Sequence, residues 1–216
     1  MKPIYFDNAA TTALEPRVKN SIIEAMEADG NPSSSHALGR KSKALIESAR
    51  TNVASLFACQ PSEIIFTSGG TEADNLAILG TVESGKISTI ISSPLEHPAI
   101  IDSIRKAQKL FEVEVKWVNV LPNGDIDLSD LKLKVQTSRN VLVSLMHVNN
   151  EIGNILDIQT VGDLCKEYSA IFHSDMVQSI GHFPINLKEL PVDLASCSAH
   201  KIHGPKGTGF LYRKKG

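Results

Sequence analysis

One lysine of this chain stands in a stretch made mostly of small residues. The stretch SCSAHKIHGPKGTG, from Ser196 to Gly209, surrounds Lys201 with alanine, serine and glycine and places His200 beside it. A surface lysine requires no such clearing, whereas a lysine that meets a bulky group does. Since a lysine amine can form a Schiff base with a carbonyl compound, Lys201 is a candidate for covalent chemistry.

Four other polar clusters follow predicted strands, as Lys201 does. They are Thr67–Glu72, Glu96–Pro98, His147–Glu151 and Asp175–Gln178. Each cluster alone is compatible with a structural role, such as a helix cap, a turn or a buried, hydrogen-bonded carboxylate. In open α/β sheets, however, ligands bind beyond the carboxyl ends of the strands. The convergence of five clusters on that edge therefore predicts one common site.

The elements that position these clusters alternate between β-rich and amphipathic helical runs. The candidate strands are Glu63–Thr67, Ile87–Ser92, Glu112–Val120, Val141–His147, Ala170–Val177, Val192–Ser198 and Thr208–Arg213. Several are continuous apolar runs, which is typical of parallel strands covered on both faces. The link from Ser198 to Thr208 is too short for a crossover helix, so the last strand should be antiparallel. The sequence predicts an α/β fold with three layers (α/β/α) around a mostly parallel, seven-stranded sheet.

Composition narrows the classes of protein to consider. The chain has 216 residues and a formal net charge of −2, without a basic block, so neither nucleic acid nor an anionic membrane is an expected partner. No apolar run is long enough to cross a bilayer, and the N-terminus lacks the apolar core of a signal peptide. Cys59, Cys165 and Cys197 are widely spaced and are expected to be reduced core thiols of a cytoplasmic protein.

The ligand chemistry follows by comparison of cofactor classes. Neither a G-x-G-x-x-G fingerprint nor a phosphate-binding G-x-x-x-x-G-K-[ST] loop is present, and the histidines show no zinc-site spacing. Pyridoxal phosphate (PLP) fits each cluster. Its phosphate suits the helix terminus at Gly70 and Thr71, its ring nitrogen requires a carboxylate such as Asp175, and its aldehyde requires the amine of Lys201.

The motifs resemble a known family closely. In chain order YFDNAATT, GNPSSSHALGR, FTSGGTEADNLAI, EHPAI, MHVNNEIGNI, HSDMVQSIGHFPI and SAHKIHGPKGTGFLY are similar to the NifS/IscS-type cysteine desulfurases. These enzymes belong to the class V aminotransferase group of fold type I PLP enzymes. The resemblance covers essentially the whole chain.

The resemblance implies roles for nine residues. Catalysis would use Lys201, which carries the cofactor and moves protons at the substrate, and His97, which stacks on the pyridine ring. The residues implied to bind PLP are Gly70, Thr71, His97, Asn150, Asp175, Gln178, Ser198, His200 and Lys201. Two further segments, Asn8–Ala10 and Asn31–Ser34, resemble segments that line the substrate entrance.

The implied activity converts L-cysteine to L-alanine and leaves the sulfur on the enzyme as a persulfide. A sulfur-acceptor protein would then receive it for iron–sulfur assembly or thiolation, and the enzyme would be a homodimer. The resemblance also implies a division into an N-terminal segment, residues 1–30, and a PLP-binding large domain, residues 31–216.

Three departures from the family pattern bear on this function. The family's catalytic-loop cysteine and small C-terminal domain would follow residue 216, so we expect this chain alone to be inactive, with helices missing from one sheet face. Cys197 alternates with Ser196 and Ser198 along a strand and should face away from the site. Met176 is bulkier than the usual residue and is expected to shift the cofactor slightly.

Two alternative functions stay open on these residues. One is another class V PLP enzyme, namely a selenocysteine lyase, a sulfinate-acting relative or an aminotransferase. The other is a non-catalytic chain that binds only the cofactor or a partner chain.

Overall fold

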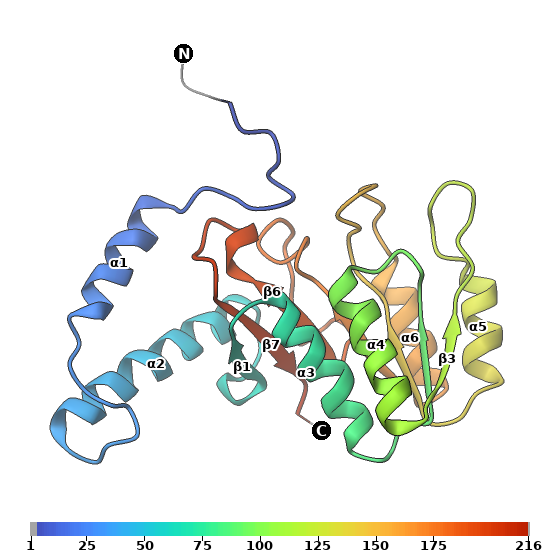
Figure 1. Cartoon of the computed structure of the whole chain (residues 1–216), viewed down its shortest axis with the longest axis horizontal. Helices are drawn as coiled ribbons and strands as arrows, with labels where there is room; N and C mark the ends of the chain where they lie inside the picture. The colour runs from blue at the N-terminus through green and yellow to red at the C-terminus, as the bar shows by residue number, and fades with distance from the viewer. Residues whose placement is uncertain (1–3, 216) are drawn as a thin grey trace.

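A computed structural model describes residues 4–215 of the chain (Figure 1). The elements in chain order are α1 (Pro16–Met26), α2 (Ala37–Leu56), η1 (Pro61–Glu63), β1 (Ile64–Thr67), α3 (Gly70–Glu83), β2 (Thr89–Ser92), α4 (Pro98–Phe111), β3 (Glu114–Trp117), α5 (Leu128–Gln136), β4 (Val141–Ser144), α6 (Ile158–Glu167), β5 (Ile171–Asp175), β6 (Leu194–Ser198), η2 (Ala199–Lys201) and β7 (Gly209–Arg213). The two η elements are short 3-10 helices.

The seven strands form one sheet in the order β1-β7-β6-β5-β4-β2-β3. The neighbours from β3 through β6 pair in parallel, whereas β7 is antiparallel to both β1 and β6. The predicted sheet and its antiparallel last strand are therefore confirmed. The strands are shorter than expected: the third ends at Trp117 because the chain then turns back, and Val120 forms an isolated antiparallel bridge with Ile126.

Helices cover both faces of the sheet. Successive side chains along each strand point to opposite faces and so pack into two separate hydrophobic cores. Ile91 and Val143 pack with α5 and α6, while the adjacent residues Ile90 and Leu142 pack with α3 and α4. Figure 1 shows α3 and α4 on the side nearer the viewer, α6 behind the strands and α5 at the right-hand edge, beside β3. Strands β2, β4 and β6 are buried along their whole length, which explains the apolar runs of β2 and β4 and the small residues of β6.

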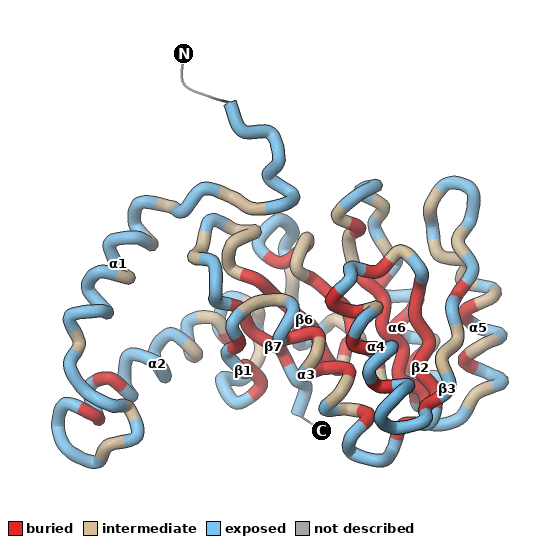
Figure 2. The backbone as a smooth tube through the Cα atoms, viewed as in Figure 1, coloured by how far each residue is buried: buried red, intermediate tan, exposed pale blue. Residues whose placement is uncertain are grey.

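The expectation of an uncovered sheet face is wrong. Exposed apolar side chains gather instead on the two N-terminal helices, where α1 has no buried residue at all (Figure 2). On these helices they are Ile23, Met26, Leu38, Leu45, Ile46 and Leu56. The sheet is covered because α2, α5 and α6 already fill its second face. No helix within residues 4–215 is both long and apolar enough to cross a membrane.

Candidate active site

All nine residues predicted to bind the cofactor line one cavity at the carboxyl edge of the sheet. The cavity has a volume of about 450 Å³. Its walls come from the turns that follow β1, β2, β4, β5 and β6, and from the N-terminal segment. Parallel strands bring the ends of distant sequence segments to one edge, so the fold itself makes this convergence.

Lys201 lies in η2, directly after β6, and its amine points to the N-terminal segment. Nζ donates hydrogen bonds to the carbonyl oxygens of Ala9 and Ala10, the second at 3.0 Å. Burial lowers the pKa of Lys201, an effect that Asp175 and Asp7 partly oppose. A lysine of this kind loses its proton more readily than an exposed one and is a better nucleophile.

Residues 7–13 form a segment that we call the N-terminal strap, which lies across the η2 turn. The backbone N–H and the hydroxyl of Thr12 both donate to the His200 carbonyl oxygen at 2.9 Å, and the same hydroxyl oxygen accepts the His203 N–H at 2.7 Å. Gln178 donates to the Ala9 carbonyl oxygen at 2.9 Å. The strap therefore closes one side of the cavity with main-chain atoms.

Asp175 ends β5 and is 7% exposed. Its Oδ1 accepts the backbone N–H of Val177 at 2.9 Å. Burial raises the pKa of Asp175, while that hydrogen bond, His97 and Lys201 act in the opposite direction. A buried carboxylate opposite a lysine is the arrangement that a protonated ring nitrogen requires.

The turn after β1 provides an anion site. Gly69 has a φ of +150°, in a region that favours glycine, and Gly70 begins α3. A Cβ on Gly70 would lie 2.8 Å from Cγ2 of Val177, so a side chain there would intrude on the cavity wall. The first N–H groups of a helix have no partner within the helix, and Thr71 and Ser198 add hydroxyl groups beside them.

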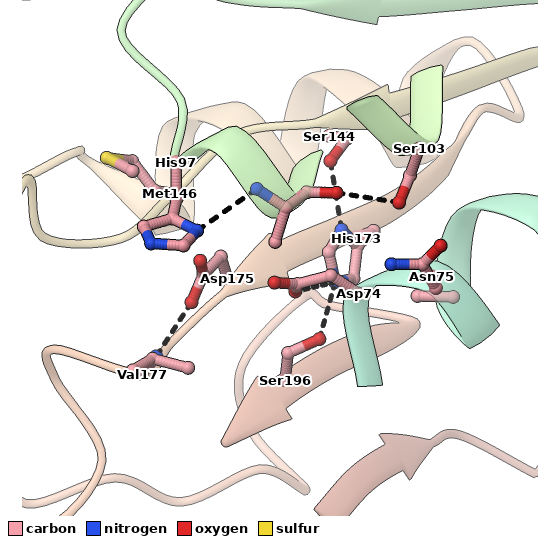
Figure 3. A network of polar contacts seen from close by, with 12 residues as sticks. Asp74, Asn75, His97, Ser103, Ser144, Met146, His173, Asp175, Val177 and Ser196 are labelled. Atoms are coloured by element: carbon pink, nitrogen blue, oxygen red, sulfur yellow. Dashed lines mark hydrogen bonds and ion pairs between the residues drawn. The ribbon is translucent and has the colours of Figure 1, made fainter. Parts of the chain in front are cut away.

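His97 has both a structural role and a place in the cavity wall. Of the consecutive residues Asn149 and Asn150, the first has a structural role and the second faces the cavity. His97 caps α4, because its Nδ1 accepts the Ala99 N–H at 3.1 Å, and its ring also lines the cavity (Figure 3). Asn149 is buried and fixes the loop after β4: its Oδ1 accepts the N–H groups of Glu151 and Ile152. Asn150 is the asparagine that faces the cavity.

A second cavity of about 430 Å³ lies next to the first, and Met146 lines both. Its polar wall includes Asp127 and Asp157, which cap α5 and α6, and the buried Glu96. Glu96 accepts the Ser93 hydroxyl at 2.8 Å and the Met146 N–H at 3.0 Å. Burial raises the pKa of Glu96 to about 8.

Asp74 was not predicted from the sequence as a residue of the site. Met176 and the Asn31–Ser34 loop were expected to affect the site or line its entrance, but the structure places them elsewhere. Asp74 lines the main cavity, and a signal existed, since Asp74 shares a helix face with the buried residues Ala77 and Ile78. Met176 does not bear on the cavity, because its fully buried side chain packs in the core beneath. The Asn31–Ser34 loop does not line this cavity: it joins α1 to α2, at the far side of the molecule (Figure 1).

None of the three cysteines lines the main cavity. Cys197 is 2% exposed and packs in the core on the far face of β6, as the alternation predicted, while Ser196 faces His173. Burial raises the pKa of Cys197 and of Cys165 to about 12 each, and that of the half-buried Cys59 to about 11. Residues 4–215 also contain no group of three or more side chains suited to a metal ion.

Comparison with known proteins identifies the class to which this site belongs. Residues 4–216 match the family described as Aminotransferase class-V, and the chain belongs to that family. This confirms the family predicted from the motifs.

Individual relatives are more specific than the family. The cysteine desulfurase IscS of Edwardsiella ictaluri is 46% identical over 99% of this chain. A solved NifS-like protein superposes on all of this chain with a TM-score of 0.92 at 39% identity. A structure described as SspA in complex with cysteine covers 98% of this chain at 31% identity, with a TM-score of 0.88. The chain spans only part of these proteins, namely 54% of the IscS relative and 60% and 61% of the two structures.

Proposed function

We propose that the main cavity binds pyridoxal 5'-phosphate and that the chain provides the cofactor-binding part of a cysteine desulfurase. The observation that carries this proposal is the placement of Lys201, Asp175 and the α3 terminus around one cavity. When bound, the cofactor supplies an electron sink for the bond changes at the substrate Cα. The proposal draws on the desulfurase relatives for the substrate, L-cysteine.

Different residues of this chain would hold different parts of the cofactor. Lys201 would hold the cofactor covalently and move a proton to and from the substrate Cα. Asp175 would keep the proton on the ring nitrogen by its negative charge. The phosphate would be held by the first N–H groups of α3, together with Thr71, Ser198 and His200. His97 would stack on the ring, with Asn150 and Gln178 near its hydroxyl group and the substrate.

Sulfur transfer needs a thiolate that can reach the substrate. Cys59, Cys165 and Cys197 lie outside the cavity wall, and burial favours the neutral thiol of each. We therefore propose that residues 1–216 bind cofactor without releasing sulfur. Homodimer formation, transfer to an acceptor protein and a cytoplasmic location belong to the same proposal for the whole protein.

The visible absorption spectrum of the purified chain with added PLP tests this function. We expect a band that survives gel filtration in the wild type and in Lys206→Ala, a matched lysine of the same loop. Lys201→Ala should lack the band. Equal bands in Lys201→Ala and wild type would contradict the assignment.

A second candidate, another class V reaction, is separated by substrate. Addition of L-cysteine, cysteine sulfinate and L-alanine to the loaded chain should change the spectrum most strongly with cysteine. A stronger response to either of the other amino acids would favour the alternative.

A further inference from the structure

Asp74 stands out among the groups of the main cavity because burial works against its charge and only the Ser196 hydroxyl supports that charge. The residue is the fifth of α3 and is 1% exposed. Within residues 4–215 its Oδ1 has no hydrogen-bond partner, and the only basic group within 4.0 Å of its carboxylate is His173. An ionised carboxylate is costly to bury without a cation and with an oxygen that has no donor.

His173 does not act as that cation. Its Nδ1 lies 2.9 Å from the Ser144 hydroxyl and its Nε2 lies 3.0 Å from the Ser196 hydroxyl, whereas Asp74 Oδ1 is 3.8 Å from Nε2. A charged pair would close to hydrogen-bond distance in preference to the serine. Complete burial lowers the pKa of His173 to about 3, so the ring is neutral.

Asp175 is the neighbour whose charge affects the protonation of Asp74. Figure 3 shows Asp74, on α3 and in front of the His173 ring, with its carboxyl group on the side of Asp175 at the end of β5, and both residues line the main cavity. Their charges repel, and burial raises the pKa of Asp74 well above its usual range, with Asp175 adding to the effect. Two adjacent carboxyl groups of this kind hold one proton between them at neutral pH.

The surroundings of the two residues decide which one holds the proton. Asp175 accepts a backbone N–H and faces His97 and Lys201, all of which favour its charged form. At Asp74 burial and the negative charge of Asp175 favour the neutral form, and only the Ser196 hydroxyl opposes them. The titratable groups around the pair are Asp7, Glu96, His97, His173 and Lys201.

We propose that Asp74 carries a proton at neutral pH and leaves Asp175 as the single ionised carboxylate on the floor of the cavity. Asp74 is then a positioning residue: it fixes where the negative charge meets the ring nitrogen of the cofactor. The cofactor role of this inference rests on the proposed function, but the location of the proton does not.

Infrared spectroscopy of the cofactor-free chain tests the location of the proton. In protein whose aspartate side chains carry heavy carbon at the carboxyl group, a protonated carboxyl gives a shifted C=O band at pH 7. We expect the band in wild type, in Asp175→Asn and in Asp102→Asn, an exposed control on α4, and its loss in Asp74→Asn. Absence of the band from wild type, or its persistence in Asp74→Asn, would overturn the proposal. If Asp74→Asn does not fold, the wild-type and Asp175→Asn spectra still decide.

Cofactor affinity provides the second readout. Asn is neutral like a protonated Asp, so Asp74→Asn should bind PLP within about threefold of wild type, whereas Asp175→Asn should bind at least about tenfold more weakly. Equal weakening by the two substitutions would show that Asp74 is ionised. If wild type itself binds no PLP, the proposed function fails, while the infrared result still tests Asp74 alone.

Discussion

The two neighbouring cavities differ little in volume, 450 against 430 Å³, but they differ in the state of their polar groups. In the second cavity the carboxylates are already bound: Asp127 accepts the N–H groups of Ser129 and Asp130, and Asp157 accepts that of Thr160. In the first, Asp74 has an oxygen without a partner and Lys201 meets only main-chain oxygens.

This difference separates a site from a packing gap. Groups that already cap helices have little capacity left for a ligand, whereas a buried carboxyl pair and a half-buried amine gain new partners when a ligand arrives. Four predictions test the contrast, from the largest expected effect to the smallest.

Glu96, which lines the second cavity, should make stability depend strongly on pH. Its folded pKa of about 8 lies above the unfolded value, so its contribution is complete below pH of roughly 4.5 and is lost as pH rises through 8. The free energy of unfolding should fall by up to about 1.4 kcal/mol per pH unit in this window. Urea unfolding of Glu96→Gln should show a flatter profile; identical profiles would mean that Glu96 is ionised in the fold.

A methyl group at Gly70 should disturb the first cavity. Gly70→Ala places Cβ against Val177, and we expect PLP affinity to fall by about tenfold, or roughly 1.4 kcal/mol. Val177→Ala removes the contacting methyl groups, so the double variant should recover most of the loss. A double variant as weak as Gly70→Ala would exclude steric conflict as the cause.

Loss of a cap in the second cavity should affect stability alone. Asp157→Ala removes the side chain that accepts the Thr160 N–H at 3.1 Å, and we expect the free energy of unfolding to fall by about 1 kcal/mol. The PLP band should not change. Asp163→Ala, an exposed position within the same helix, is the control; loss of the band in Asp157→Ala would show that the cavities are coupled.

The smallest effect is expected at the strap. Thr12→Val keeps the side-chain shape but removes the hydroxyl that bonds the His200 carbonyl and the His203 N–H. The free energy of unfolding should therefore fall by about 1 kcal/mol or less. PLP affinity should fall by about twofold to threefold, since the strap closes the cavity. Thr51→Val on the exposed side of α2 should leave that affinity unchanged.

The position of the first cavity could be predicted from the sequence, because residues that follow parallel strands all lie at the carboxyl edge of the sheet. Polar residues directly after apolar runs, such as Thr71 and Asp175, had to meet there. The residue types then indicated the ligand. Of the cofactor classes compared, PLP is the one that suits a lysine, a carboxylate and a helix terminus together.

The rest depended on three-dimensional packing that spacing does not encode. The partner of Lys201 is the main chain of Ala9 and Ala10, and an alanine carbonyl leaves no trace in a motif. Met176 follows Asp175 in sequence, but adjacent residues of a strand end point in opposite directions, so it entered the core. The importance of Asp74 appears only once its missing partner is known.

The strap has a consequence for the biogenesis of the protein. Thr12 and His200, which it joins, are 188 positions apart in the chain. During synthesis the early residues must wait for almost the whole sheet to emerge before they find their partners, and contacts between such distant residues form slowly. The lysine pocket therefore cannot take shape before η2 has been synthesised, although the strap is among the first segments made.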